Sequence, residues 1–142
     1  MIYTPLTKKA MKLCFQAHKD QLDKSGIPYV FHPIHLAEQM DDEYSTVTAL
    51  LHDVVEDTSY TFEDLQNFGY PEEVLEALRL LTHDKAVPYM EYVAAIKGNP
   101  IARKVKLADL RHNSDITRLN VIDQRALERV KKYREAINFL EK

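Results

Sequence analysis

The segment LLHDVVEDT, residues 50–58, places one imidazole and three carboxylates inside an apolar run. These titratable residues are His52, Asp53, Glu56 and Asp57. Burying several carboxylates together is costly unless a cation compensates their charge. The segment therefore predicts a cation site inside the protein or, as the simpler alternative, a core histidine followed by a solvated end of a helix.

Two other segments carry donor atoms that suit such a cation. FHPIHL contains His32 at the start of a predicted helix, and KLADLRHN contains Asp109 between apolar residues. Together with His52 and Asp53 they would form a set of two imidazoles and two carboxylates. This mixture of nitrogen and oxygen ligands favours manganese or iron and differs from the thiolate sites typical of structural zinc.

Helical spacing relates the acidic pair to these donors. If residues 50–57 form one helix, His52 and Asp53 point about 100° apart, so both reach one ion only if an edge of the helix faces it. Glu56 and Asp57 then lie one turn further on, where a general base or a group that orients water is needed.

The elements that must position these groups are helices. The pairs Thr4-Pro5 and Asn99-Pro100 are typical of helix starts, as is Asp123 before the last apolar-periodic segment. Apolar residues recur at helical spacing between such signals, including a predicted helix that Ser45 caps and that runs through Val54, and strand-like alternation is absent. The sequence predicts an all-α domain of seven or eight short helices.

Composition narrows the class of protein. The chain has 142 residues, 45% of them hydrophobic and 29% charged, which fits one globular domain. A net charge of -3 argues against a nucleic-acid partner. No apolar stretch approaches the roughly 20 residues of a membrane span. A single cysteine, Cys14, excludes an intrachain disulfide, and with no signal-peptide pattern we expect a cytoplasmic protein.

The chain resembles the HD-domain metal-dependent phosphohydrolases. More closely, it resembles the alarmone hydrolase domain of the RelA/SpoT enzymes and their small stand-alone relatives. Four stretches carry the resemblance over most of residues 17–113: AHKDQLDKSGIPYVFHPI, LLHDVVEDT, FEDLQNFG and VKLADLRHN. The resemblance implies a helical HD domain around one metal ion, typically Mn²⁺. We expect this domain to span residues 1–142 with no synthetase or regulatory domain, in contrast to the long members of the family.

The resemblance also implies roles for individual residues. The family's metal-ligand positions are occupied here by His32, His52, Asp53 and Asp109. The acidic pair that organises the attacking water corresponds to Glu56 and Asp57. The positions that line the nucleotide pocket are occupied by Lys24, Ser25, Asn113 and, on the last helix, Tyr133.

The implied activity is removal of the 3′-pyrophosphate from guanosine tetra- or pentaphosphate (ppGpp or pppGpp), the nucleotides of the stringent response. The expected partner is therefore a small nucleotide. Asp23 stands where the long family members commonly have an arginine, which predicts weaker discrimination of the base. The alternatives are the same chemistry on another phosphorylated nucleotide, a non-catalytic nucleotide-binding HD module, and a structural helical bundle.

Overall fold

The computed structural model describes all 142 residues and is helical throughout. It contains nine α-helices and one 3-10 helix, η1, and its only extended pairing is an isolated bridge between Leu22 and Pro28. The elements are α1 (Pro5–His18), α2 (Phe31–Glu38), α3 (Glu43–Leu51), α4 (Val54–Asp57), α5 (Phe62–Asn67), α6 (Glu72–Leu81), α7 (Tyr89–Lys97), α8 (Pro100–Asn113), η1 (Ile116–Arg118) and α9 (Gln124–Glu141). The predicted all-α class is confirmed.

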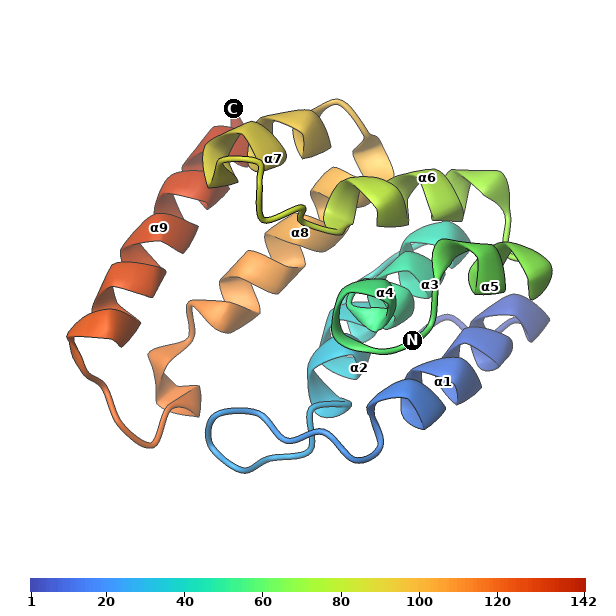
Figure 1. The fold of residues 1–142 in the computed structure, drawn as a ribbon, viewed down its shortest axis with the longest axis horizontal. Coiled ribbons are helices and arrows are strands. Elements are labelled where there is room, and N and C mark those ends of the chain that lie inside the picture. Colours follow the sequence, from blue (N-terminus) through green and yellow to red (C-terminus); the bar gives the residue numbers. More distant parts are fainter.

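Two helices organise the packing. Helix α3 is buried at every residue from Ser45 to Leu51 and contacts α1, α2, α6 and α8. Helix α8 runs through the middle of the molecule, with α2 and α3 on one side and α9 on the other (Figure 1). Because α3 is enclosed by other helices over residues 45–51, α3 and the inner face of α8 form the centre of one shared core.

Side-chain caps fix where the helices begin. The Thr4, Asn99 and Asp123 side chains accept hydrogen bonds from the first-turn N–H groups of α1, α8 and α9. The predicted starts of these three helices are thereby confirmed. Helix α3 begins earlier than predicted, because Asp42 rather than Ser45 is its cap and accepts from the Ser45 N–H at 2.8 Å.

The prediction of one helix from Ser45 through Val54 is wrong at its end. Helix α3 stops at Leu51, His52 and Asp53 form a turn, and the four-residue helix α4 follows. The His52 imidazole supplies a physical reason, because its Nδ1 lies 2.7 Å from the Ala49 carbonyl, which would accept from Asp53 N–H in a continuous helix. The break divides one predicted helix into α3 and α4, so the chain has nine α-helices instead of at most eight. It also changes the directions in which the His52 and Asp53 side chains point.

No helix combines the length and the apolar character that crossing a membrane requires.

Candidate metal centre

Three side chains from distant parts of the sequence meet beneath the surface. His32 comes from α2, His52 from the turn after α3, and Asp109 from α8. Asp109 Oδ1 lies 2.9 Å from His32 Nε2 and 3.6 Å from His52 Nε2. All three residues are buried, and their ligand atoms lie within 4.8 Å of one another, a spacing that suits one shared ion.

The hydrogen bonding of His52 shows that this group fits a cation. Its Nδ1 lies beside the Ala49 carbonyl, which can only accept, so Nδ1 is the donor, and the Nε2 of a neutral ring then carries the lone pair. That Nε2 is buried, has no hydrogen-bond partner, and faces carboxylate oxygens of Asp53 at 3.1 Å and Asp109 at 3.6 Å. Acceptors that face one another in a buried site are destabilising unless a cation lies between them. The donor set present therefore fits a divalent cation.

Asp53 lies between this group and the acidic pair. Its Oδ2 accepts a hydrogen bond from the Tyr29 hydroxyl, a contact that sequence reasoning missed. Burial, reinforced by the neighbouring carboxylates, raises the pKa of Asp53 well above its ordinary value. Its carboxylate also lies within 4.8 Å of those of Glu56 and Asp57. The structure thus places four predicted ligands and the acidic pair in one continuous cluster.

A largely buried lysine supports the cluster and was also missed. The Lys106 ammonium lies 3.0 Å from Asp109 Oδ2 and 5.2 Å from the centre of the Tyr92 ring. Burial alone would raise the pKa of Asp109, but the Lys106 charge and the hydrogen bond from His32 hold it well below its usual range. Asp109 is therefore a carboxylate and keeps the charge that a metal ligand needs.

The acidic pair borders a cavity of about 200 Å³. Both residues are exposed, and the Glu56 carboxylate accepts a hydrogen bond of 2.8 Å from the His83 N–H. The same cavity is lined by Asp53, Lys106 and Asp109. Glu56 and Asp57 thus form an exposed helix end, as the simpler alternative expected, yet they share a solvent-filled space with the candidate ligands.

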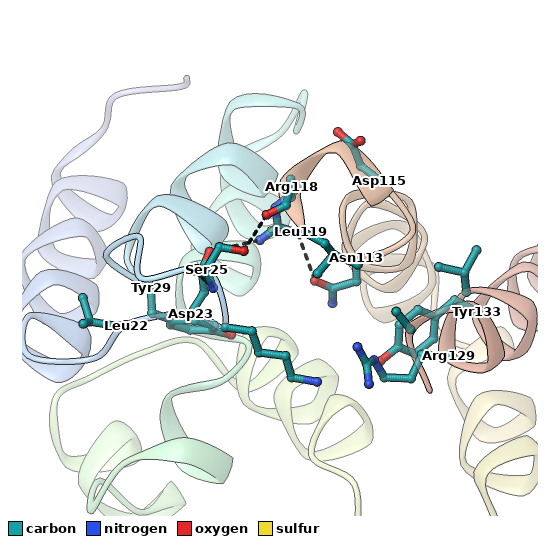
Figure 2. A pocket seen from close by; sticks show the side chains of 13 residues that line it. Leu22, Asp23, Ser25, Tyr29, Asn113, Asp115, Arg118, Leu119, Arg129 and Tyr133 are labelled. Carbon is teal, nitrogen blue, oxygen red and sulfur yellow. Dashed lines mark hydrogen bonds and ion pairs between the residues drawn. The ribbon is translucent and has the colours of Figure 1, made fainter. Parts of the chain in front are cut away.

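A larger cavity of about 320 Å³ adjoins the first. Its walls come from the loop after α1 on one side and from α8, η1 and α9 on the other (Figure 2). Asn113 and Tyr133 border both cavities, which joins them. The lining of the larger cavity has three cationic side chains, from Lys24, Arg118 and Arg129, against two carboxylates, from Asp23 and Asp115, and so carries a net positive charge. Its chemistry suits an anionic ligand larger than inorganic phosphate.

The four residues predicted to contact the nucleotide all line this larger cavity, and two of them already have partners. The Ser25 hydroxyl donates to the Arg118 carbonyl at 2.7 Å. The Asn113 amide donates to Asp109 Oδ1 at 3.0 Å and accepts from the Arg118 guanidinium at 3.2 Å. Asn113 is therefore tied to the candidate metal centre as well as to the cavity.

Asp23 has a structural role that the sequence comparison did not suggest. Its Oδ1 accepts hydrogen bonds from the backbone N–H groups of Ser25 and Ile27, at 2.8 and 3.0 Å. Its Oδ2 lies 3.9 Å from the Arg118 guanidinium. The carboxylate therefore shapes the loop, and its charge is balanced within the cavity wall.

A further histidine lies behind His32. The Nδ1 atoms of His32 and His112 are 2.7 Å apart, and the His112 ring is stacked on His35 with centroids 4.0 Å apart. Burial lowers the pKa of His32, and burial with the nearby Arg118 charge lowers that of His112 to about 4. Both rings are therefore neutral at neutral pH.

Comparisons with known proteins agree with this geometry. The chain is 33% identical over 118 residues to a GTP pyrophosphokinase of Streptomyces coelicolor and 33% identical over 120 residues to the bifunctional (p)ppGpp synthase/hydrolase SpoT of Escherichia coli. Each match covers 75% of this chain but only 14% and 17%, respectively, of those proteins. A scan of protein-family profiles finds no match.

The fold has a close counterpart among solved structures. A metazoan ortholog of SpoT, which hydrolyses ppGpp and plays a role in starvation responses, superposes with a TM-score of 0.79 at 24% identity. The match covers 99% of this chain and 87% of that one, so the whole helical arrangement is shared. By sequence and by fold together, the chain is an HD-fold relative of the SpoT/RelA-type (p)ppGpp enzymes.

Proposed function

We propose that this protein is a metal-dependent phosphohydrolase that releases pyrophosphate from the 3′ position of ppGpp or pppGpp. One observation carries the proposal: the unpartnered Nε2 of His52 faces Asp53 and Asp109 where a cation is required. The names of the sequence relatives support ppGpp as the substrate.

The candidate ligands of the ion are His32, His52, Asp53 and Asp109, and this set favours Mn²⁺. When bound, such an ion supplies a water of lowered pKa and neutralises phosphate charge. Glu56 and Asp57 would orient that water and accept its proton at a carboxylate oxygen. Release of pyrophosphate then requires attack at the phosphorus bonded to the 3′ oxygen.

The larger cavity would hold the rest of the nucleotide. Lys24 and Arg129 supply positive charge for phosphate groups, Lys24 as a point charge and Arg129 as a planar fork. Tyr133 would lie between the two cavities, beside the sugar. Asp23 stands where long family members commonly have an arginine, so this position offers no planar cation to stack on the base. We therefore expect weak discrimination between guanine and adenine.

A nucleotide panel tests the proposal. With Mn²⁺ present, we expect pyrophosphate release from ppGpp, and a comparable rate from its adenosine counterpart. Cleavage of other phosphorylated nucleotides without either of these would retain the hydrolytic chemistry and reject the alarmone substrate. Binding of ppGpp without cleavage of any compound would instead indicate a nucleotide-binding module.

Lys24 gives a prediction about substrate binding. Replacing Lys24 by alanine should raise the Michaelis constant for both nucleotides by about tenfold or more, since a hydrogen bond to a charged group contributes about 1.5–3 kcal/mol. Lys19→Ala is the matched control, because Lys19 is exposed at the end of α1 and lines neither cavity. Equal Michaelis constants for the Lys24 variant and the control would remove Lys24 from the binding site.

A further inference from the structure

We propose that Gln21 is a positioning residue that caps the C-terminus of α4 and thereby holds Asp57 where it can orient the attacking water. The inference rests on the proposed function, since it gives Asp57 a part in hydrolysis. It concerns a residue of the loop after α1 that lines neither cavity of the site.

Helix α4 is too short to hold the acidic pair by itself. It has four residues and ends at Asp57. The Asp57 and Thr58 N–H groups donate to the carbonyls of Asp53 and Val54, at 2.9 and 3.1 Å. Isolated helices shorter than about 12–15 residues are marginal in water. The position of Asp57 therefore depends on contacts from other elements.

Gln21 supplies such a contact. The last carbonyl groups of a helix have no partner within the helix. One of them, the carbonyl of Asp57, accepts a hydrogen bond of 3.1 Å from the Gln21 side-chain amide. The two residues are 36 positions apart, and α1 and α4 contact each other. The bond thus ties the end of α4 to the chain that follows α1.

The Gln21 amide has one orientation that satisfies its surroundings. The Asp57 carbonyl can only accept, so the amide must turn its nitrogen toward it. The amide oxygen then faces the buried ring of His18 and accepts from its Nδ1 at 2.9 Å. A flipped amide would set oxygen against oxygen at Asp57. His18 therefore keeps the donor of Gln21 directed at the end of α4.

The backbone of Gln21 is fixed independently of its side chain. Its N–H donates to the His18 carbonyl at 3.0 Å, and its carbonyl accepts from the Tyr29 N–H at 2.9 Å. Tyr29 in turn contacts Asp53 through its hydroxyl. A substitution of the Gln21 side chain leaves these backbone bonds in place, so it tests the contact with Asp57 alone.

Glu56 has an anchor of its own. Its carboxylate accepts from the His83 N–H at 2.8 Å, so loss of the Gln21 contact releases Asp57 more than Glu56. Asp57 is exposed and Gln21 is partly exposed, which lets water replace the amide at the Asp57 carbonyl. We therefore expect a loss of catalytic positioning with little loss of stability.

Two variants separate the hydrogen bond from the bulk of the side chain. Gln21→Met keeps the length without polar atoms, and Gln21→Glu keeps the oxygen that faces His18 but removes the donor to Asp57. With ppGpp and Mn²⁺, both should lower kcat by about tenfold or more, because a misplacement of about 1 Å can cost roughly 10²-fold. The Michaelis constant, the Mn²⁺ affinity and the melting temperature should stay near wild type. Normal kcat in Gln21→Glu would assign the effect to bulk and overturn the inference.

The matched control is a second glutamine of the same region. Gln16 is exposed on α1 and lines neither cavity, so Gln16→Met should retain the wild-type kcat. An equal loss of kcat in Gln16→Met and Gln21→Met would show that the contact with Asp57 is not the cause.

A double-mutant cycle tests whether Gln21 acts through Asp57. In an Asp57→Asn background, Gln21→Met should cost less than about twofold in kcat, since the group that Gln21 positions has already lost its function. A merely structural role would lower kcat by the same factor in both backgrounds, and that result would overturn the inference.

Amide hydrogen exchange reports on the cap without any activity. In Gln21→Met the N–H groups of Asp57 and Thr58 should exchange about 3–10-fold faster, the factor expected for one lost hydrogen bond. Unchanged exchange, or unchanged kcat, in an active protein would overturn this inference and leave the proposed hydrolase intact. Faster exchange in a protein that cleaves no nucleotide would instead reject the proposed function, while Gln21 would remain the cap of α4.

Discussion

Replacing Asp109 by asparagine should abolish binding of a divalent metal and lower the free energy of unfolding by about 3–5 kcal/mol, the usual effect of removing one partner of a buried ion pair. The asparagine leaves the Lys106 ammonium without its carboxylate, at a site where both side chains are about nine-tenths buried. It also removes the negative charge between His32 and His52 and replaces one carboxylate oxygen by an NH₂ group, which cannot bind a metal. Urea denaturation with and without Mn²⁺ measures both effects.

A double variant distinguishes the ion pair from the metal. Lys106→Met combined with Asp109→Leu replaces the pair with apolar side chains, which is often neutral for stability. We expect it to recover most of the metal-free stability of the wild type. Added Mn²⁺ should stabilise only the wild type, by about 2.7 kcal/mol at a hundredfold excess over its dissociation constant. An Asp109→Asn protein stabilised by Mn²⁺ as strongly as the wild type would show that this carboxylate is not a ligand.

Glu56→Gln and Asp57→Asn should keep the metal and lose turnover. A general base contributes a factor on the order of 10² or more, so each variant should fall by at least that factor in kcat if it takes or orients the proton. Both amides preserve the shape of the side chain. In the wild type the Glu56 carboxylate accepts a hydrogen bond from the His83 N–H, and the glutamine oxygen can accept the same bond. Kinetics with ppGpp and elemental analysis of the same samples test the two halves of the prediction.

The control for this pair is an exposed acid outside the site. Glu63 lies in the first turn of α5 and borders neither cavity of the site, so Glu63→Gln should retain normal turnover. If both acidic-pair variants match the Glu63 control, Glu56 and Asp57 are only a solvated helix end. If they lose metal as well as turnover, they belong to the ligand set instead.

Most of the helical framework could be predicted because its signals are local. The caps at Thr4, Asn99 and Asp123 each involve residues within three positions along the chain. The break after Leu51 could not be predicted in this way, since its cause is a side-chain contact of His52 that competes with a backbone hydrogen bond. Apolar periodicity continues across the break and gives no sign of it.

The site was predictable in its residue types but not in its supporting contacts. His32, His52 and Asp109 stood out because ionisable groups are unusual in apolar segments. Lys106 did not, although it precedes Asp109 by one helical turn, because a lysine in a helix is usually solvated. The contact of Tyr29 with Asp53 had no local signal at all, since it depends on how α2 packs against the turn after α3.

The candidate metal ligands are made at different times during synthesis of the chain, and this order determines when the site can form. His32 and Asp109 are 77 positions apart, so a growing chain exposes both histidines to the cell long before the carboxylate between them has been made. Chains fold from the N-terminus as they emerge, and α1 to α3 can pack early, but α8 must arrive before the ion has its full set of ligands. Metal capture would then be a late event that marks a completed core. A chain truncated before α8 keeps His32, His52 and Asp53 but lacks Asp109, so it should bind the ion more weakly than the full chain.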